Sequence, residues 1–267
     1  MPPKRVFTAL VGLPILALLI FYSEPFIFFL ALLVTALIGQ NEFYHLQESE
    51  GFHLQKFLGL LMGALLLAGF YAGDGALVSG ILVLFILLAM VFRTFSGRDV
   101  GQAVREISVT CFGLYYVPYL FGYLLLLRGV PSGRTWVFFL FLTVWAGDTG
   151  AYYIGTRYGK RKLFPKVSPK KTLEGSAGGL LCSLIAGGVG KLVFSLPVEG
   201  LVAPALLGAG LGLIGQVGDL AESILKRSSG IKDSGVLFPG HGGVLDRFDS
   251  ILFAAPALYY FLQSGIG

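Results

Sequence analysis

Charged and hydroxyl side chains with a regular spacing gather in residues 218–249, near the end of a chain that is otherwise mostly Leu, Ala, Gly and Phe. Four of them stand at intervals of three and four residues: Asp219, Glu222, Ser223 and Lys226. On a helix this spacing puts two carboxylates and a cation along one face. Carboxylate oxygens suit Mg²⁺, whose remaining positions are usually filled by water and substrate phosphates. The pattern therefore predicts metal-assisted phosphate chemistry.

A second pair of carboxylates, Asp246 and Asp249, stands where the last apolar run begins, in "LDRFD". A separation of three residues puts the pair on one helical face and turns Arg247 away from it. Carboxylates at the ends of two adjacent helices can meet, so we expect Asp219 and Asp246 to hold Mg²⁺, with a second metal ion left open. The set of candidate metal ligands is completed by Asp249, Asp148 and Glu222.

Asp148 stands among apolar and small residues in "WAGDTGAYYIG". An ionised carboxylate near the middle of a membrane costs about 2.5 to 3.5 kcal/mol, so such a residue is a functional candidate. The alternative is that Asp148 lies near the membrane surface, where it only caps a helix or pairs locally.

The turn "FPGHGG" lies between the two groups of carboxylates. Pro239 and Gly240 signal a turn, and Gly242 and Gly243 leave backbone N–H groups unshielded, which suits a phosphate. His241 is a candidate phosphate contact or proton donor, and an ordinary turn histidine is the alternative.

A salt-bridged loop is the competing interpretation of residues 218–249. In that loop Asp219 would neutralise Lys226, and Asp246 would neutralise Arg247. The pairing accounts for the charges but leaves the histidine and the glycines of the turn without a role, so we favour a functional site.

The elements that must position these residues are membrane helices. Of 267 residues, 55% are hydrophobic and 13% are charged, with a mean hydropathy of +0.78, whereas soluble domains carry about 25% charged residues. With their small and weakly polar flanks, nine apolar runs approach the ~20 residues that cross a bilayer: 7–22, 25–39, 57–71, 76–92, 109–127, 136–154, 177–195, 200–217 and 250–262. We predict an all-α polytopic integral membrane protein with about nine transmembrane helices.

The distribution of Lys and Arg predicts the orientation. With nine spans and a cytoplasmic N-terminus, the inner segments hold 17 of the 20 Lys and Arg, and the outer loops hold only Arg128 and Arg134. Residues 218–249 then face the cytoplasm, and the C-terminus faces out. The first run is kept as a span because no small-residue cleavage site follows it.

Two regions of the sequence differ in how regularly small residues recur. We predict that residues 1–108 form a transmembrane scaffold of about four spans and that residues 109–267 form a catalytic region of about five spans. Small residues recur every four positions in the second region, which lets helices pack closely: Gly147, Ala151 and Gly155; Gly175, Gly179, Ser183 and Gly187; Gly208 and Gly212. Both cysteines, Cys111 and Cys182, are expected to be packing residues.

Two connecting segments carry further polar residues. Residues 40–56 hold His45 and His53 beside three glutamates, and we interpret them as a solvated interfacial stretch, because no metal-ligand spacing is present. Residues 155–175 hold seven Lys and Arg at the inner surface, where they set topology and attract anionic lipids. Lys170 and Lys171, just before the next span, are the candidates for a direct phosphate contact.

The segment from Ser223 to Asp249 reads S-x-L-K-R-x4-K-D-x-G-x2-F-P-x-H-G-G-V-x-D-R-F-D and resembles the signature of phosphatidate cytidylyltransferases, also called CDP-diacylglycerol synthases. We find no departure from that signature. The resemblance implies that CTP and phosphatidic acid give CDP-diacylglycerol and pyrophosphate, with Mg²⁺, at the cytoplasmic face of the cell membrane. With the small-residue stripes it also makes a homodimer the expectation. No nucleic acid partner is expected.

The chemistry of that reaction assigns roles to the charged residues. A phosphomonoester has a second pKa near ~6 and is largely a dianion at neutral pH, so its attack on CTP needs little help from a base. One polyanion must still approach another, so cations are expected to clamp the phosphates: Lys226, Arg227, Lys232 and Arg247. Asp219, His241 and Asp246 complete the expected catalytic set. Ser223 is a metal or phosphate contact, or bonds back to its own helix.

Two other functions fit parts of the pattern. A different CTP-dependent membrane enzyme would make a CDP-linked isoprenoid ether lipid or would phosphorylate a lipid alcohol, with the same need for metal and triphosphate. A secondary transporter would use Asp148 and Asp219 to bind a coupling ion, but the sequence has no detectable repeated half.

Overall fold

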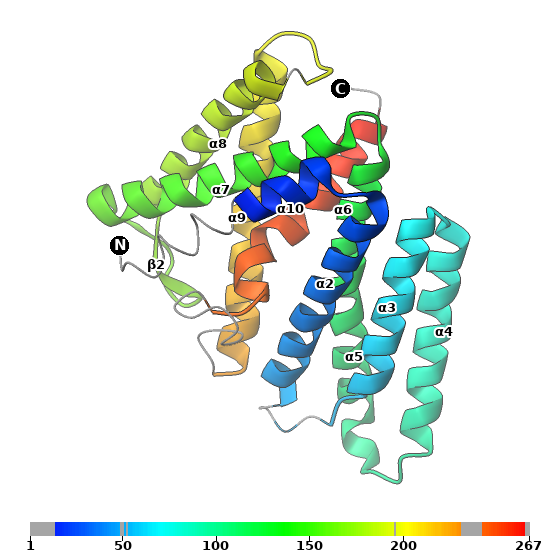
Figure 1. The fold of residues 1–267 in the computed structure, drawn as a ribbon. Helices are drawn as coiled ribbons and strands as arrows, with labels where there is room; N and C mark the ends of the chain where they lie inside the picture. Colours follow the sequence, from blue (N-terminus) through cyan, green and yellow to red (C-terminus); the bar gives the residue numbers. More distant parts are fainter. Residues whose placement is uncertain (1–13, 49–50, 52, 195, 231–241, 265–267) are drawn as a thin grey trace. The chain divides into compact units, whose positions relative to one another are not determined.

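The computed structural model describes residues 14–48, 51, 53–194, 196–230 and 242–264. In this part of the chain every expected apolar run lies on a helix (Figure 1), which confirms the prediction of an all-α polytopic membrane protein. Among the described residues, six helical segments are long and apolar enough to cross a membrane: α2 (Pro25–Glu48), α4 (Gly75–Thr94), Val100–Gly129, α7 (Gly133–Tyr158), α8 (Leu173–Phe194) and α9 (Val202–Ser228). Because α3 (Lys56–Ala72) is shorter and α10 (Leu245–Gln263) begins with several charged residues, the number of nine spans stays a prediction.

The described structure divides into two compact units, each assembled from separate stretches of the chain. The first unit takes its described residues from 1–15, 22–126 and 228–247, and the second takes them from 16–21, 127–227 and 248–267. These units reflect packing. The division into a scaffold and a catalytic region after residue 108 concerns function and stays a prediction.

The first unit contains a helical hairpin whose turn follows from its sequence. α3 ends where Gly73 adopts a left-handed conformation, with φ of 70°, a conformation that glycine tolerates without strain. α4 then begins because the Asp74 carboxylate accepts hydrogen bonds from the N–H groups of Ala76 and Leu77. α3 and α4 therefore pack as an antiparallel pair, drawn in cyan in Figure 1.

The segment Val100–Gly129 of this unit changes its helical geometry along its length. It consists of a 3₁₀ turn η1 (Val100–Gln102), α5 (Ala103–Leu114), a π-helical turn η2 (Tyr115–Tyr119) and α6 (Leu120–Gly129). Pro118 lies inside η2 and has no N–H to donate, which accounts for the local widening of the helix. The surrounding core is made of fully buried side chains: Phe43, Tyr44, Leu66, Phe85, Leu114 and Phe121.

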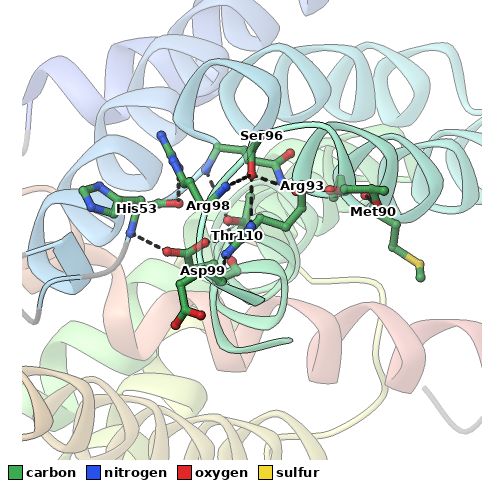
Figure 2. Close-up of polar contacts among 11 residues, drawn as sticks. His53, Met90, Arg93, Ser96, Arg98, Asp99 and Thr110 are labelled. Atoms are coloured by element: carbon green, nitrogen blue, oxygen red, sulfur yellow. Dashed lines mark hydrogen bonds and ion pairs between the residues drawn. The ribbon is translucent and has the colours of Figure 1, made fainter. Parts of the chain in front are cut away.

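A buried polar network joins the end of α4 to α5. Arg93 donates from Nε to Glu106 Oε2 at 2.6 Å, from Nη1 to Ser96 Oγ at 3.0 Å, and from Nη2 to the backbone oxygen of Asp99 at 2.6 Å. The Thr110 hydroxyl donates to the backbone oxygen of Glu106. We call these five residues the arginine network, and Figure 2 shows Arg93, Ser96, Asp99 and Thr110 drawn together.

The prediction that residues 40–56 form a solvated interfacial stretch is wrong for the first half of that segment. α2 continues to Glu48, and several polar side chains of its last turns are buried: Gln40, Glu42, Tyr44 and Gln47. The Gln40 amide donates to the Tyr44 hydroxyl, which in turn donates to the Thr110 carbonyl. These hydrogen bonds allow polar groups to be enclosed.

In the second unit, α7 and α8 lie side by side and are joined by a hairpin of two strands, β1 (Lys162–Phe164) and β2 (Ser168–Thr172) (Figure 1). The strands are antiparallel, with Lys162 opposite Thr172. At the start of α8, Glu174 accepts hydrogen bonds from the N–H groups of Lys160 and Arg161, which ties the hairpin to the helix. The sequence predictions place a cationic loop here and do not include these strands.

Small residues let the helices of the second unit approach closely, as their spacing predicts. A Cβ atom at Gly147 of α7 would collide with the Ser183 hydroxyl, and one at Gly208 of α9 would lie 2.5 Å from the Ser183 backbone oxygen. The Ser183 hydroxyl donates to the Thr143 carbonyl at 2.9 Å. α7 and α9 therefore both pack against the same turn of α8. Both cysteines are free thiols, and Cys182 packs against Gly150.

Candidate functional site

The predicted polar face of α9 lies on one continuous helix. Lys226 Nζ lies 2.6 Å from Glu222 Oε2, one turn back along the helix. Asp219 pairs with Lys171 of β2 at 2.7 Å. Asp219 and Lys226, which the salt-bridged alternative pairs with each other, thus each form an ion pair with another residue, and the Asp246–Arg247 pair of that alternative stays a prediction.

Asp249 of α10 joins these residues because α9 and α10 pass very close to each other. At Gly218 a Cβ atom would lie 2.5 Å from the backbone oxygen of Asp249, so only glycine fits there. The buried Asp249 side chain lies close to Glu222 and faces the charges of Asp219 and Lys226. We call this group the lysine–carboxylate cluster: Lys171, Asp219, Glu222, Lys226 and Asp249.

Among the described residues, the cluster brings together three carboxyl groups and two ammonium groups, a set that can take a further cation. Ionised carboxylates only accept hydrogen bonds, so Glu222 and Asp249 stay in contact only with a proton or a cation between them. Among the described residues, no three His, Cys, Asp or Glu side chains are arranged to hold a metal ion by themselves. Mg²⁺ does not need such a cage, because one or two carboxylates with water and substrate phosphates are its usual ligands. On that ground the cluster fits Mg²⁺.

The hairpin brings cations to the cluster. Of the two lysines expected to touch phosphate, Lys171 lies beside Asp219, while Lys170 is exposed to solvent. Arg227, also exposed, donates from Nε to the Val167 carbonyl in the hairpin at 3.4 Å. Cations from two separate segments, β2 and α9, are therefore gathered at carboxylates, which suits the binding of a polyanion together with a metal.

Backbone N–H groups at the start of α10 are held by carboxylates. Gly242 has φ of 80°, and the Gly243 N–H donates to Asp246 Oδ2 at 2.8 Å. The N–H groups of Val244 and Leu245 donate to the Glu42 carboxylate of α2. The acceptors of these three N–H groups are carboxylates of the protein itself. A phosphate contact by Gly242 or Gly243 stays a prediction.

The remaining predicted residues are placed as follows. Ser223 is half-buried on α9 and Asp148 is half-buried on α7. Arg247 is exposed while Asp249 is buried, in agreement with the expectation that Arg247 turns away from the carboxylates. Lys232 and His241 lie outside the described residues. The roles of all these residues in metal or substrate binding stay predictions.

The sequence predictions do not include two polar residues that hold helices in place. Glu42 holds the start of α10, and Gln216, one turn before Asp219, exchanges hydrogen bonds with Ser176 of α8. A signal for Glu42 exists, because Phe43, Tyr44 and Leu46 continue the apolar pattern of the preceding helix. Gln216 shares the helical face of Asp219, so its position one turn away is the signal that could have found it.

Known proteins share much of this sequence. Residues 3–265 match the model of a family described as the Cytidylyltransferase family. A phosphatidate cytidylyltransferase of Bacillus subtilis is 38% identical over 72% of this chain and 71% of the relative. Relatives of the same name from Staphylococcus epidermidis and Synechocystis are 35% identical (95% of this chain, 96% of the relative) and 31% identical (98% and 97%).

Proposed function

Because this chain belongs to the cytidylyltransferase family, we propose that it transfers CMP from CTP to phosphatidic acid, giving CDP-diacylglycerol and pyrophosphate. The observation that carries the proposal is the lysine–carboxylate cluster, in which carboxyl groups outnumber the cations they face. Such a cluster can hold a divalent cation and phosphate groups together, which is what a reaction between two polyanions requires.

The residues of the chain would then act mainly by binding and orienting. The phosphate of phosphatidic acid is largely a dianion at neutral pH, so it can attack the α-phosphate of CTP without a general base. Lys171 and Lys226 would hold phosphate oxygens and offset the repulsion between the two substrates. Asp219 and Asp246, with Asp249 as a further candidate, would hold Mg²⁺. When bound, the metal would neutralise charge on the phosphates and on the leaving pyrophosphate.

The membrane face and the assembly are part of the same proposal. CTP is soluble and phosphatidic acid stays in its leaflet, so the reacting atoms would meet at the membrane surface. The excess of Lys and Arg in the segments on one side supports the cytoplasmic surface. The small-residue stripes and the family resemblance support a homodimer.

The test is an assay of purified protein with phosphatidic acid vesicles, Mg²⁺ and CTP labelled in the α-phosphate. The expected result is label on the lipid, pyrophosphate as co-product, and loss of turnover when EDTA removes the metal. Release of CDP with transfer of a single phosphate would identify a lipid kinase. Turnover only with an isoprenoid ether lipid would change the acceptor, and solute flux in proteoliposomes without CTP turnover would identify a transporter.

A further inference from the structure

Glu42 is a buried carboxylate in the last part of α2, with 8% of the residue exposed. Oε1 accepts a hydrogen bond from the Val244 N–H and Oε2 accepts one from the Leu245 N–H, both at 3.0 Å. Leu245 is the first residue of α10, so these N–H groups have no partner within their own helix. A negative charge at this end also interacts favourably with the helix dipole.

The packing between α2 and the start of α10 is close. A Cβ atom at Gly243 would collide with the Glu42 carboxylate, so a larger residue there would displace that side chain from the N–H groups it accepts from. One turn earlier on α2, a Cβ atom at Gly39 would stand 3.4 Å from the side chains of Val244 and Leu245. These two side chains are only 2% and 1% exposed.

The same helix also holds the other end of the loop that joins α9 to α10. Gln47 Nε2 donates to the hydroxyl of Ser229, a buried residue that directly follows α9, at 3.3 Å. Glu42 and Gln47 stand about 7.5 Å apart along the helix axis. α2 therefore fixes both ends of this loop. The Glu42 contact is the stronger one, because hydrogen bonds to a charged group stabilise more than neutral ones do.

We propose that Glu42 is a positioning residue: by holding the first N–H groups of α10, it sets the place and direction of the helical turns that carry Asp246 and Asp249. The inference rests on the proposed function, in which these carboxylates bind the metal. A small displacement of catalytic groups is costly to turnover, and substitution of residues that orient metal ligands lowers activity by about 10–100-fold.

The test compares Glu42→Ala with Glu48→Ala in the full-length protein in detergent. Glu48 is a matched control, because it lies on the same helix, is partly exposed and pairs with Lys56. We expect Glu42→Ala to lower kcat by about 10–100-fold with little change in the KM for CTP, and Glu48→Ala to change neither. Glu42→Gln keeps one acceptor oxygen and loses the charge, so its kcat should fall between those of Glu42→Ala and the wild type.

A second readout does not depend on catalysis. Hydrogen–deuterium exchange read by mass spectrometry should be faster at Val244 and Leu245 in Glu42→Ala and unchanged in α7 and α8, because the two amides lose their acceptor. If Glu42→Ala does not fold, Glu42→Gln provides both readouts, with a smaller change expected in each.

The inference is overturned by unchanged exchange at these amides, by wild-type kcat in the Glu42 variants, or by an equal loss in Glu48→Ala. Failure of the proposed function gives a different result. If the wild-type protein makes no CDP-lipid, the proposed function is wrong. Hydrogen exchange at Val244 and Leu245 would still report whether Glu42 holds α10.

Discussion

The arginine network and the lysine–carboxylate cluster are both built from acids and bases on helices, yet they differ in balance and in exposure. In the network, Arg93 and Glu106 pair one to one, with 4% and 5% of their side chains exposed. In the cluster, Lys171 and Asp219 are 25% and 35% exposed, and three carboxyl groups face two lysines. The network is enclosed and matched in charge, whereas the cluster joins a partly exposed pair, Lys171 and Asp219, to the buried carboxyl groups of Glu222 and Asp249.

The difference separates a structural role from a functional one. A buried ion pair must be matched, because an uncompensated charge in the interior is strongly destabilising. In the network each of the three guanidinium nitrogens donates to a partner inside the protein, namely Glu106, Ser96 or the Asp99 backbone (Figure 2). A partly exposed cluster with an excess of acid can take a further cation, which is typical of functional sites.

Substitutions at the predicted metal ligands should have the largest effect on turnover. We expect Asp219→Asn and Asp246→Asn each to lower kcat by at least about 100-fold, since even residues that only orient metal ligands cost about 10–100-fold. Thermal unfolding and size-exclusion chromatography should match the wild type, because both side chains are only half-buried. Full activity in either variant would remove that residue from the site.

Breaking the arginine network should lower the stability of the protein and leave its activity unchanged. Arg93→Met leaves Glu106 as a buried charge without its guanidinium partner, so the free energy of unfolding should fall by about 3–5 kcal/mol. The double variant Arg93→Met/Glu106→Met should recover most of that loss, because an apolar pair of similar volume has no charge to compensate. Activity per folded molecule should stay at the wild-type level in both. A specific loss of kcat in the stable double variant would assign the network to function.

Sequence reasoning succeeded where one helix sets the geometry. The face of α9 that carries Asp219, Glu222 and Lys226 follows from helical spacing alone, and the pairing of Lys226 with Glu222 is a contact between neighbouring turns. The close approach of α7, α8 and α9 also follows from the spacing of small residues. Both features are local and periodic, so a single sequence contains them.

Contacts between distant segments could not be read in this way. The Asp219–Lys171 pair depends on a hairpin whose strands are short and strongly charged. No alternating apolar pattern in the sequence therefore predicts this hairpin. The sequence pattern assigns Glu42 to solvent because the apolar run stops at Gly39, but the helix continues and buries Glu42. A polar residue gives no sign of burial when its partners are backbone N–H groups far along the chain.

The smallest expected effect tests whether the position of a cation in the hairpin matters more than its charge. Lys171 and Lys162 lie on paired strands, and replacing either by alanine removes one positive charge from the hairpin. Lys171 contacts Asp219, whereas Lys162 is exposed. A hydrogen bond to a charged group contributes about 1.5–3 kcal/mol, so the loss of the phosphate contact in Lys171→Ala should lower kcat/KM by about 10-fold. Lys162→Ala should leave it unchanged. Steady-state assays at two ionic strengths measure kcat/KM in both variants. An equal loss of kcat/KM in the two would mean that the hairpin acts through its total charge and that the position of Lys171 beside the carboxylates does not matter.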